Sequence, residues 1–557
     1  MKIALGIHIG HDRGACIIKD NEVIAAISQE RLDRIKYSRS SEIPFQAIDS
    51  ILKYCNIKPK DISCIGLSYD GIEGDSIMEI YKSELHDYYK EYLQKVPIYI
   101  VNHHDAHAYA VYHSSGFKKS VIFIADGAGD YFGNKQEAET MYIANNGVIH
   151  RVSQRLQSPP VRRIGDDINF IYPRMPSFIR DSQISIGRKY EQITHLIGFG
   201  WGEAGKTMGL ASYGTPMINF NKKDFKDLSF SLTYSDIISK IYSLQLLSNK
   251  RFSEFIKSEK ANIASTVQNF VEISVTSIIK NAMEEFDCKN ICLGGGLFLN
   301  CLTNQKIIEQ CAPKNMFILP ATGDDGQAIG CAYYAYHHLF GENNSYKITL
   351  PYLGLSYNDD EILDSIKSKN LSYKYYSDND LCEIMAKFIS NNKIVAFHRG
   401  RTEIGPRALC HRSILANPTN RNMKDILNNR VKHREPFRPF APAVIEEEQY
   451  EYFDLKTNSD YMLLATTVKE EHQNNLSSIV HVDNTARVQT VSKTTNEFFH
   501  RFLTVLKQHI GYPIILNTSF NVAGEPIVET PLDALNTFLT TNIDVLIIGN
   551  YVVEKHN

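Results

Sequence analysis

The sequence lacks the features that would mark a membrane, secreted or nucleic-acid-binding protein. No apolar run is long enough to span a bilayer, and no apolar stretch typical of a signal peptide follows Met1. The net charge of -3 provides no strong basic field for nucleic acid. The ten cysteines include no CxxC pair, so buried free thiols in a reducing cytoplasm are expected. We therefore expect a cytoplasmic protein with no membrane or nucleic-acid partner.

Internal repeats and low-complexity tracts are also absent, and 557 residues are too many for one hydrophobic core. Strand-like segments alternate with helical periodicity, which is clear at 263–279, and this alternation indicates an α/β protein. A polar stretch at 341–345 marks the main boundary and gives domains 1–350 and 351–557. Residues 150–184 are basic and proline-rich, a composition that favours an inserted loop or lid.

Two histidines four residues apart are the most informative local feature. His103 and His107 face the same point if they lie on one helix. Asp126 ends the apolar run 120–125, which predicts a buried strand, and ligands of open α/β sheets bind at the carboxyl ends of strands. Two imidazoles and a carboxylate there are typical of an iron site with positions left for substrate. A surface helix with a stray histidine pair would show the same spacing.

Glycine-rich turns provide the next candidates. Three consecutive glycines follow the strand-like segment 290–293: Gly294, Gly295 and Gly296. They would let the backbone approach a ligand, and Asn300 and Asn304 would reach a ribose or base, although a tight strand-to-helix turn is the alternative. Asp324 precedes a predicted helix, where it either caps that helix or completes a metal shell.

Two further patterns are weaker. Gly200 and Gly205-Lys206-Thr207 match a phosphate loop literally, but no convincing strand precedes them and no long helix follows. We therefore discount a P-loop NTPase and keep Lys206 as a residue near a phosphate or adenylate. His11 lies on the turn of an N-terminal hairpin, the arrangement with which sugar-kinase and actin-like domains begin. A plain hairpin turn would use the same residues.

Taken in order, these pieces match a known family. The N-terminal matches are Gly10-His11-Asp12, Glu30-Arg31, His103 with His107, Asp126-Gly127, 206–211, 294–296 with Asn300, and Gly323-Asp324. The C-terminal matches are Gly405-Pro406-Arg407-Ala408-Leu409, 412–416, 431–442, Ala486-Arg487-Val488-Gln489, 517–521 and Gly524-Glu525-Pro526. The chain resembles the O-carbamoyltransferases of antibiotic and nodulation-factor biosynthesis.

The resemblance implies both fold and reaction. The N-terminal domain is similar to the tRNA threonylcarbamoyl-transfer protein of the actin-like (ASKHA) superfamily, and the C-terminal domain looks like a YrdC-like α/β domain. In the family's reaction, ATP with Mg²⁺ and carbamoyl phosphate give a carbamoyl adenylate. Its carbamoyl group then passes to a hydroxyl of a small-molecule natural product. A homodimer is possible.

The resemblance and the charges together suggest residue roles. A divalent metal, with Fe²⁺ expected, would be held by His103, His107, Asp126 and Asp324 and would polarise the carbonyl. His11, as contact to the acceptor or as base, and Lys206 are the other N-terminal candidates. The phosphate-binding and catalytic candidates of the C-terminal domain are Arg407, Lys432, Arg438 and Arg487, with Arg412 as a further donor and Ser519 and Asn521 as neutral partners. A solvated basic surface is the alternative.

Departures from the family and other functions stay open. Cys410 and His411 stand where the family commonly has Gly and Asn, and Thr402 and Ile404 replace a Met and a Phe. A sugar-kinase-like phosphotransferase would leave the second domain unexplained, and net acidity weighs against a threonylcarbamoyl-type tRNA-modifying enzyme. The acceptor is not readable from the sequence, but the basic segment 162–188 is expected to border the acceptor pocket.

Overall fold

The computed structural model describes residues 1–69, 75–89, 92–93, 95–157, 184–230, 234–341, 347–348 and 350–555. Most of the predicted lid, including Arg162, Arg163, Arg174 and Arg180, lies outside the described residues, as does most of the polar boundary stretch. Arg188 is described, in α5 (Ile186–Leu196). Within these ranges no helix has both the length and the apolar character needed to cross a membrane.

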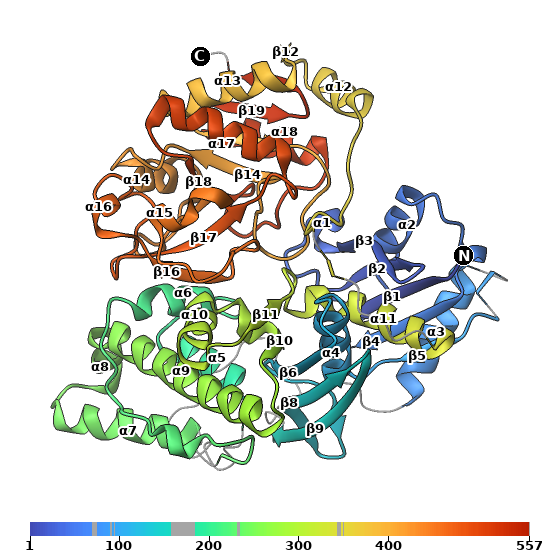
Figure 1. The fold of residues 1–557 in the computed structure, drawn as a ribbon, viewed down its shortest axis with the longest axis vertical. Helices are drawn as coiled ribbons and strands as arrows, with labels where there is room; N and C mark the ends of the chain where they lie inside the picture. Colours follow the sequence, from blue (N-terminus) through green and yellow to red (C-terminus); the bar gives the residue numbers. More distant parts are fainter. Residues whose placement is uncertain are drawn as a thin grey trace.

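The N-terminal half contains two sheets of the same topology (Figure 1). The first has the order β3-β2-β1-β4-β5, with bounds β1 (Ile3–Ile9), β2 (Gly14–Lys19), β3 (Glu22–Ser28), β4 (Cys64–Tyr69) and β5 (Ile98–Ile100). The second repeats it as β9-β8-β6-β10-β11, with bounds β6 (Lys119–Ala125), β8 (Lys135–Asn145), β9 (Val148–Gln157), β10 (Asn290–Gly294) and β11 (Asn315–Ile318). In each, three antiparallel strands are followed by two parallel ones. The short β7 (Tyr131–Phe132) pairs with β8. This duplication of topology, which no sequence repeat reveals, agrees with the predicted actin-like arrangement.

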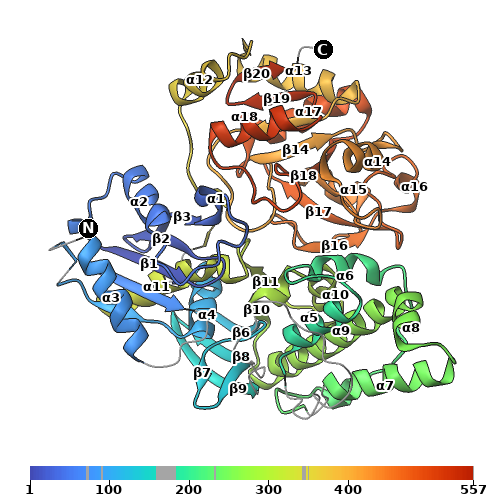
Figure 2. The same cartoon turned by 180° about the vertical axis from the view of Figure 1, so that it is seen from behind.

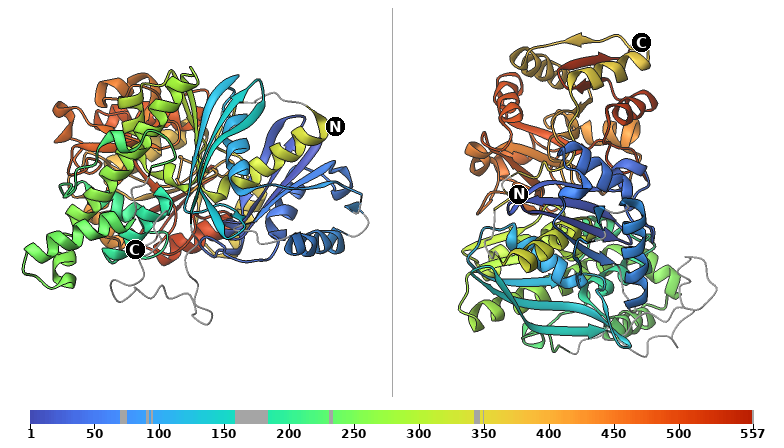
Figure 3. Two further views of the ribbon diagram at one scale, coloured as in Figure 1. Left: turned by 90° about the horizontal axis from the view of Figure 1, so that it is seen from below. Right: turned by 90° about the vertical axis from the view of Figure 1, so that its right-hand side faces the viewer.

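Two helices lie between these sheets and position the site (Figure 3). They are α4 (His103–His113) and α11 (Gln327–Phe340). A Cβ atom on Gly6 or Gly66 would collide with the α11 backbone, and one on Gly330 would collide with α4. Small residues therefore let α11 lie directly on β1, β4 and α4. The strand alternation of β6 turns Ile122 and Ile124 toward this layer.

Helices also cover the outer faces of both sheets. The first sheet packs against α2 (Phe45–Tyr54) and α3 (Asp75–Tyr89), with α1 (Glu30–Asp33) at its edge. The second packs Val121 and Phe123 of β6 against a helical group. That group consists of α5, α6 (Ala204–Ala211), α7 (Tyr234–Leu247), α8 (Phe252–Ser258), α9 (Lys260–Glu285) and α10 (Cys301–Cys311).

The C-terminal half forms one sheet of nine strands with helices on both faces (Figure 2). Its order is β12-β20-β19-β13-β14-β18-β15-β17-β16. The strands are β12 (Lys374–Tyr375), β13 (Val395–His398), β14 (Arg412–Ala416), β15 (Ala441–Ile445), β16 (Leu464–Thr467), β17 (Thr485–Val491), β18 (Ile514–Ser519), β19 (Val545–Ile548) and β20 (Tyr551–Glu554). One face packs against α13 (Asp378–Ser390) and α17 (Glu497–Ile510). The other face packs against α12 (Asp359–Ser368), α14 (Met423–Leu427), α15 (Gln449–Tyr452) and α18 (Pro531–Thr540). The short α16 (Glu470–Gln473) lies in the connection between β16 and β17.

Hydrogen bonds join the two halves at several points. Arg31 donates to the carbonyl of Gly405 at 2.8 Å, and buried Asn304 donates to that of Leu463 at 2.9 Å. The sheet topology of the two halves confirms the predicted α/β class, with an actin-like half followed by a second α/β half. The boundary at 350/351 stays a prediction.

Arg412 has a structural position that differs from the phosphate-binding role expected for it. Its side chain is 0% exposed and donates to the carbonyl oxygens of Arg399, Gly400, His411 and Glu529. The buried carboxylates of Glu403 and Glu529 oppose the fall in pKa that burial imposes on Arg412. Arg412 thus holds the turn before β14.

Replacing Arg412 with methionine is expected to destabilise the fold by on the order of 3–5 kcal/mol, because it removes a buried cation that faces two buried carboxylates. The urea midpoint of the full chain measures this. Arg430→Ala is the control, since Arg430 is 39% exposed and its ion pair with Asp544 is worth less than about 1 kcal/mol. Equal midpoints for the two variants would contradict the structural role.

Candidate active site

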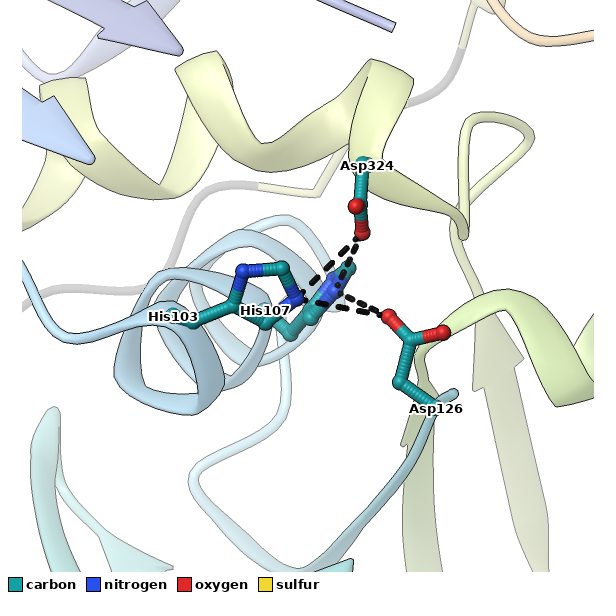
Figure 4. Close-up of side chains that lie close together, drawn as sticks. All are labelled: His103, His107, Asp126 and Asp324. Carbon is teal, nitrogen blue, oxygen red and sulfur yellow. Dashed lines mark hydrogen bonds and ion pairs between the residues drawn. The ribbon is translucent and has the colours of Figure 1, made fainter. Parts of the chain in front are cut away.

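Four side chains from three distant segments converge in the N-terminal half (Figure 4). His107 Nε2 lies 3.1 Å from Asp126 Oδ2 and 3.1 Å from Asp324 Oδ1. His103 Nε2 lies 3.4 Å from the same two oxygens. The structure therefore brings together all four predicted metal ligands, with one ligand atom from each within 4.8 Å of the others.

The elements explain this convergence. His103 and His107 are one turn apart on α4, Asp126 follows β6, and Asp324 lies in the turn before α11. The Asn102 side chain caps α4 by accepting from the amide of Asp105. His104 faces away from the cluster and bonds Thr140 at 2.7 Å. Because His103 and His107 converge with two carboxylates, they are not a stray histidine pair on a surface helix.

The charges of the cluster depend on one another. Burial lowers the pKa of His103, but the charge of Asp324 and the hydrogen bond to Asp126 outweigh it and raise that pKa well above its usual value. Burial and the charge of Asp324 raise the pKa of Asp126, but hydrogen bonds from both histidines outweigh them and lower it to about 2. Two facing carboxylates and two imidazoles, of which Asp126 alone is partly exposed, fit a divalent cation.

Sequence reasoning missed two residues that support the cluster. Gln327, the first residue of α11, places its amide nitrogen 2.8 Å from His103 Nε2 and 3.2 Å from His107 Nε2. Asp130 accepts from the backbone amide of His103 at 2.9 Å and from the Asn102 side chain at 3.0 Å. Asp130 stands four residues after Asp126, which is the only sequence signal for it.

His11 lies next to this cluster, and its role toward the acceptor stays a prediction. Its Nε2 lies 3.1 Å from Asp324 Oδ2 and its Nδ1 lies 3.0 Å from Asp12 Oδ2. Burial is the main reason that the pKa of Asp12 rises to about 6, with His11 opposing the rise. The imidazole therefore lies between two carboxylates.

The three glycines lie against the metal cluster. Gly295 has φ +99, and a Cβ atom there would collide with Ala125. A Cβ atom on Gly296 would lie 3.2 Å from Asp126 Oδ1, and Gly294 adjoins His107. Asn300 caps α10 and pairs with Gln268 at 2.8 Å. The turn alone accounts for Gly295 and Asn300, and their proposed nucleotide contacts stay predictions.

A second cluster gathers the C-terminal candidates at the boundary between the halves. Buried Lys432 donates to the Ser519 carbonyl at 2.6 Å and to Asn521 Oδ1 at 2.9 Å, so three of the predicted residues meet. Burial and the charges of Arg434 and Arg438 lower the pKa of Lys432 well below its usual value.

The guanidinium groups around Lys432 repel one another. Burial and the charge of Arg487 lower the pKa of Arg407 to about 9, and burial with Arg438 and Arg487 does the same for Arg434. The buried Nε atoms of Arg407, Arg434 and Arg487 have no hydrogen-bond partner among the described residues. Unpaired buried donors of one charge are typical of an anion site. Arg434 was not singled out by the sequence.

Lys206 occupies a different position from the other cations. It lies in α6, which follows a turn rather than a strand, as our rejection of a P-loop requires. Its amino group contacts Glu203 and, from the other half of the chain, Glu435, both at 2.5 Å. Its proposed catalytic role stays a prediction.

Tyr37 lies near both His11–Asp12 and the cationic cluster. Burial raises its pKa to about 12, the charges of Asp12 and Glu30 add to the rise, and Arg438 opposes it. Asp12, the partner of His11, and Arg438 of the cationic cluster therefore act on the same phenol.

Comparison with known proteins agrees with this architecture. A family model described as "Carbamoyltransferase N-terminus" matches residues 75–333, and one described as "Carbamoyltransferase C-terminus" matches residues 386–555. An uncharacterized protein of Synechocystis is 30% identical, over 98% of this chain and 95% of the relative. The nodulation protein NolNO of Sinorhizobium fredii is 29% identical, over 98% of this chain and 79% of the relative.

Two further proteins are similar to this chain: a relative with a named activity, and a protein whose structure has been solved. The 3'-hydroxymethylcephem-O-carbamoyltransferase of Amycolatopsis lactamdurans is 23% identical over 97% of each chain. The structure of HypF from T. kodakarensis is 15% identical, covers 62% of this chain and 48% of HypF, and has a TM-score of 0.44. The two family models and the carbamoyltransferase relative define a group-transferring enzyme, and the fold divides it into two α/β halves. The chain belongs to the carbamoyltransferase family.

Proposed function

We propose that the protein is an ATP-dependent O-carbamoyltransferase that uses carbamoyl phosphate and acts through a carbamoyl adenylate. The observation that carries this is the pairing of two unlike clusters: crowded cations with three unpaired buried Nε atoms in one half, and a metal-type cluster in the other. The first suits two phosphorylated substrates, and the second suits a carbonyl. The acceptor is proposed to be a hydroxyl of a small molecule.

The cationic cluster is the proposed activation site. Hydrolysis of carbamoyl phosphate yields carbamate and phosphate. A carbamate oxygen then attacks the α-phosphorus of ATP, forming carbamoyl adenylate and releasing pyrophosphate. Arg407, Arg434, Arg438 and Arg487 would hold the phosphate oxygens, because guanidinium groups bind such oxygens in pairs. Lys432 fixes the Ser519–Asn521 turn on which neutral contacts to the substrates depend.

The metal cluster is the proposed transfer site. His103, His107, Asp126 and Asp324 would hold a divalent cation, with Fe²⁺ favoured by the two-histidine donor set. Bound there, the cation would polarise the carbamoyl carbonyl. The acceptor oxygen would bond to the carbamoyl carbon as AMP leaves, and His11 is the proposed base that takes the hydroxyl proton. Passage inside the protein protects the adenylate from water.

This proposal predicts two separable activities. The full chain should release pyrophosphate from ATP only when carbamoyl phosphate is present, and mass spectrometry should detect carbamoyl adenylate or AMP. A chelator such as 2,2'-bipyridine, which spares Mg²⁺, should leave pyrophosphate release within about twofold of its original rate while it stops transfer. Pyrophosphate release that does not depend on carbamoyl phosphate would contradict the proposal.

A further inference from the structure

A cavity of about 280 Å³ lies in the C-terminal half, and none of the residues of the metal and cationic clusters lines it. It sits at the carboxyl ends of the parallel strands β13 and β19, the position at which α/β sheets commonly bind ligands. The first residues of α12 and α17, which cover opposite faces of the sheet, border it. The lining residues that bear on binding are Tyr357, Asp359, His398, Arg399, His411 and Phe498.

The turns that follow β13 and β19 shape the walls of this cavity. Gly400 has φ +69, and a Cβ atom there would lie 3.0 Å from Cε1 of His411. Gly549 has φ +57, and a Cβ atom there would lie 2.8 Å from Cδ1 of Ile362 in α12. Glycine permits both the conformation and the close approach at these two positions. The cavity is therefore bounded by fixed backbone on two sides.

One buried histidine of the cavity keeps a ring nitrogen unpaired. His398 is 2% exposed, and its Nε2 donates to the carbonyl of Glu529 at 2.8 Å. Burial and the charge of Arg412 lower the pKa of His398 well below its usual value, so the ring is neutral and its Nδ1 is an acceptor. Within the described part of the chain, this buried Nδ1 has no hydrogen-bond partner. A buried acceptor without a protein partner calls for a donor from outside the chain.

A second histidine presents another acceptor. His411 Nδ1 donates to the carbonyl of Arg401 at 2.6 Å, and burial lowers the pKa of the ring to about 4. At neutral pH its Nε2 therefore carries a lone pair, and no described residue donates to it. One face of the ring stacks on Tyr352, with 3.6 Å between centroids. His411 stands where the family commonly has asparagine, so this acceptor is a feature of the present chain.

The charges around the cavity disfavour an anionic ligand. Nη2 of Arg399 donates to Asp378 at 2.8 Å and to Asn550 at 3.2 Å, and its guanidinium lies 3.8 Å from the centre of the Phe498 ring. This cation is already neutralised, unlike the crowded arginines of the cationic cluster. Asp359 adds an exposed carboxylate to the wall. The cavity therefore presents acceptors and aromatic surface, which match an uncharged ring with N–H donors.

We infer that the cavity is a binding site for a flat heteroaromatic ring with an amino group, such as an aminopurine or aminopyrimidine base. The amino group would donate to Nε2 of His411, and a ring nitrogen would accept from the Tyr357 hydroxyl, which has no hydrogen-bond partner among the described residues. The rings of Tyr357, His411 and Phe498 supply the apolar contact. This site is separate from the two proposed reaction sites, and the inference does not rest on the proposed function.

Calorimetric titration of the full chain tests the ligand class. At least one of 9-methyladenine and 1-methylcytosine should bind saturably. Two comparison compounds divide the ligand into its parts: 9-methylpurine keeps the ring without the amino group, and n-butylamine keeps an amino group without the ring. Each should bind at least about tenfold more weakly, because it leaves the acceptors or the aromatic walls unused. Equal affinity for a comparison compound overturns the inference, and so does the absence of binding by both bases.

Variants of the chain test the location of the site. His411→Asn introduces the residue common in the family, so the fold should persist while the Kd of the bound base rises at least about tenfold. Tyr357→Phe keeps the ring, loses the hydroxyl and should raise the Kd by about threefold or more. His509→Asn, at an exposed histidine paired with Glu383 on the far end of α17, is the matched control and should leave the Kd unchanged.

Thermal midpoints separate lost binding from lost folding. The base should raise the midpoint of the unmodified chain and of His509→Asn but not that of His411→Asn, whose ligand-free midpoint shows whether it folds. If His411→Asn does not fold, the Kd of Tyr357→Phe decides. An unchanged Kd in every folded variant places the base elsewhere and overturns the inference.

Discussion

Replacement of His107 by alanine is expected to remove the bound metal and abolish carbamoyl transfer while pyrophosphate release continues. His107 Nε2 lies 3.1 Å from both carboxylates of the cluster, so its loss removes a central ligand. Loss of a group that only supports a metal ligand lowers affinity 10–100-fold, and a direct ligand should therefore exceed about 100-fold. Metal analysis of the purified variant measures the first effect, and His103→Ala should behave alike.

The neighbouring histidine provides the control for this prediction. His104→Gln changes an imidazole on the same helix that bonds Thr140 rather than the cluster, so the variant should keep its metal. Because the carboxylates raise the pKa of His103 in the metal-free protein, protons compete with the metal, and affinity should fall as the pH is lowered. Unchanged metal content in both His103→Ala and His107→Ala would refute the assignment.

The local pattern was sufficient to predict three of the four residues of the metal cluster. The apolar run 120–125 corresponds to β6, Lys119–Ala125, and the periodic segment 263–279 lies within α9, Lys260–Glu285. Helical spacing and the end of a strand determine where the side chains His103, His107 and Asp126 point. Asp324 needed more than pattern, because only the fold decides whether a residue before a helix caps it or turns toward a cluster 200 residues away.

Contacts between distant segments were beyond sequence reasoning. The pairing of Lys206 with Glu435 depends on how the two halves pack, and so does the contact of Trp201 with His11. Arg412 shows the opposite case. An arginine within a basic, apolar string predicts a phosphate ligand, but the side chain of Arg412 lies in the core, where main-chain carbonyls accept from its Nε and Nη1 atoms. Charge type is readable from a sequence, whereas the direction of a single side chain near a turn is not.

The cationic cluster is where function and stability should separate most clearly. Arg438 and Arg487 lower the pKa of both Arg407 and Arg434, and Arg434 and Arg438 lower that of Lys432. Among the described residues, the buried Nε atoms of Arg407, Arg434 and Arg487 have no hydrogen-bond partner. Such mutual repulsion destabilises the ligand-free fold. A site of this kind is retained for what it binds rather than for the stability of the fold.

Arg487→Met is therefore expected to lower carbamoyl-phosphate-dependent pyrophosphate release at least tenfold, because a charge-assisted contact to phosphate is worth on the order of 1.5–3 kcal/mol. The same change should leave the thermal midpoint unchanged or raise it, since it removes one of several repelling cations. Arg438→Met is expected to lose activity in the same way. Synthetic carbamoyl adenylate should restore transfer in both variants, because the metal cluster is intact.

Arg399→Met, at a cation paired with Asp378 outside the cluster, is the control and should keep pyrophosphate release. A lower midpoint for Arg487→Met together with failed rescue would show that Arg487 holds the fold, and the activation site would have to lie elsewhere.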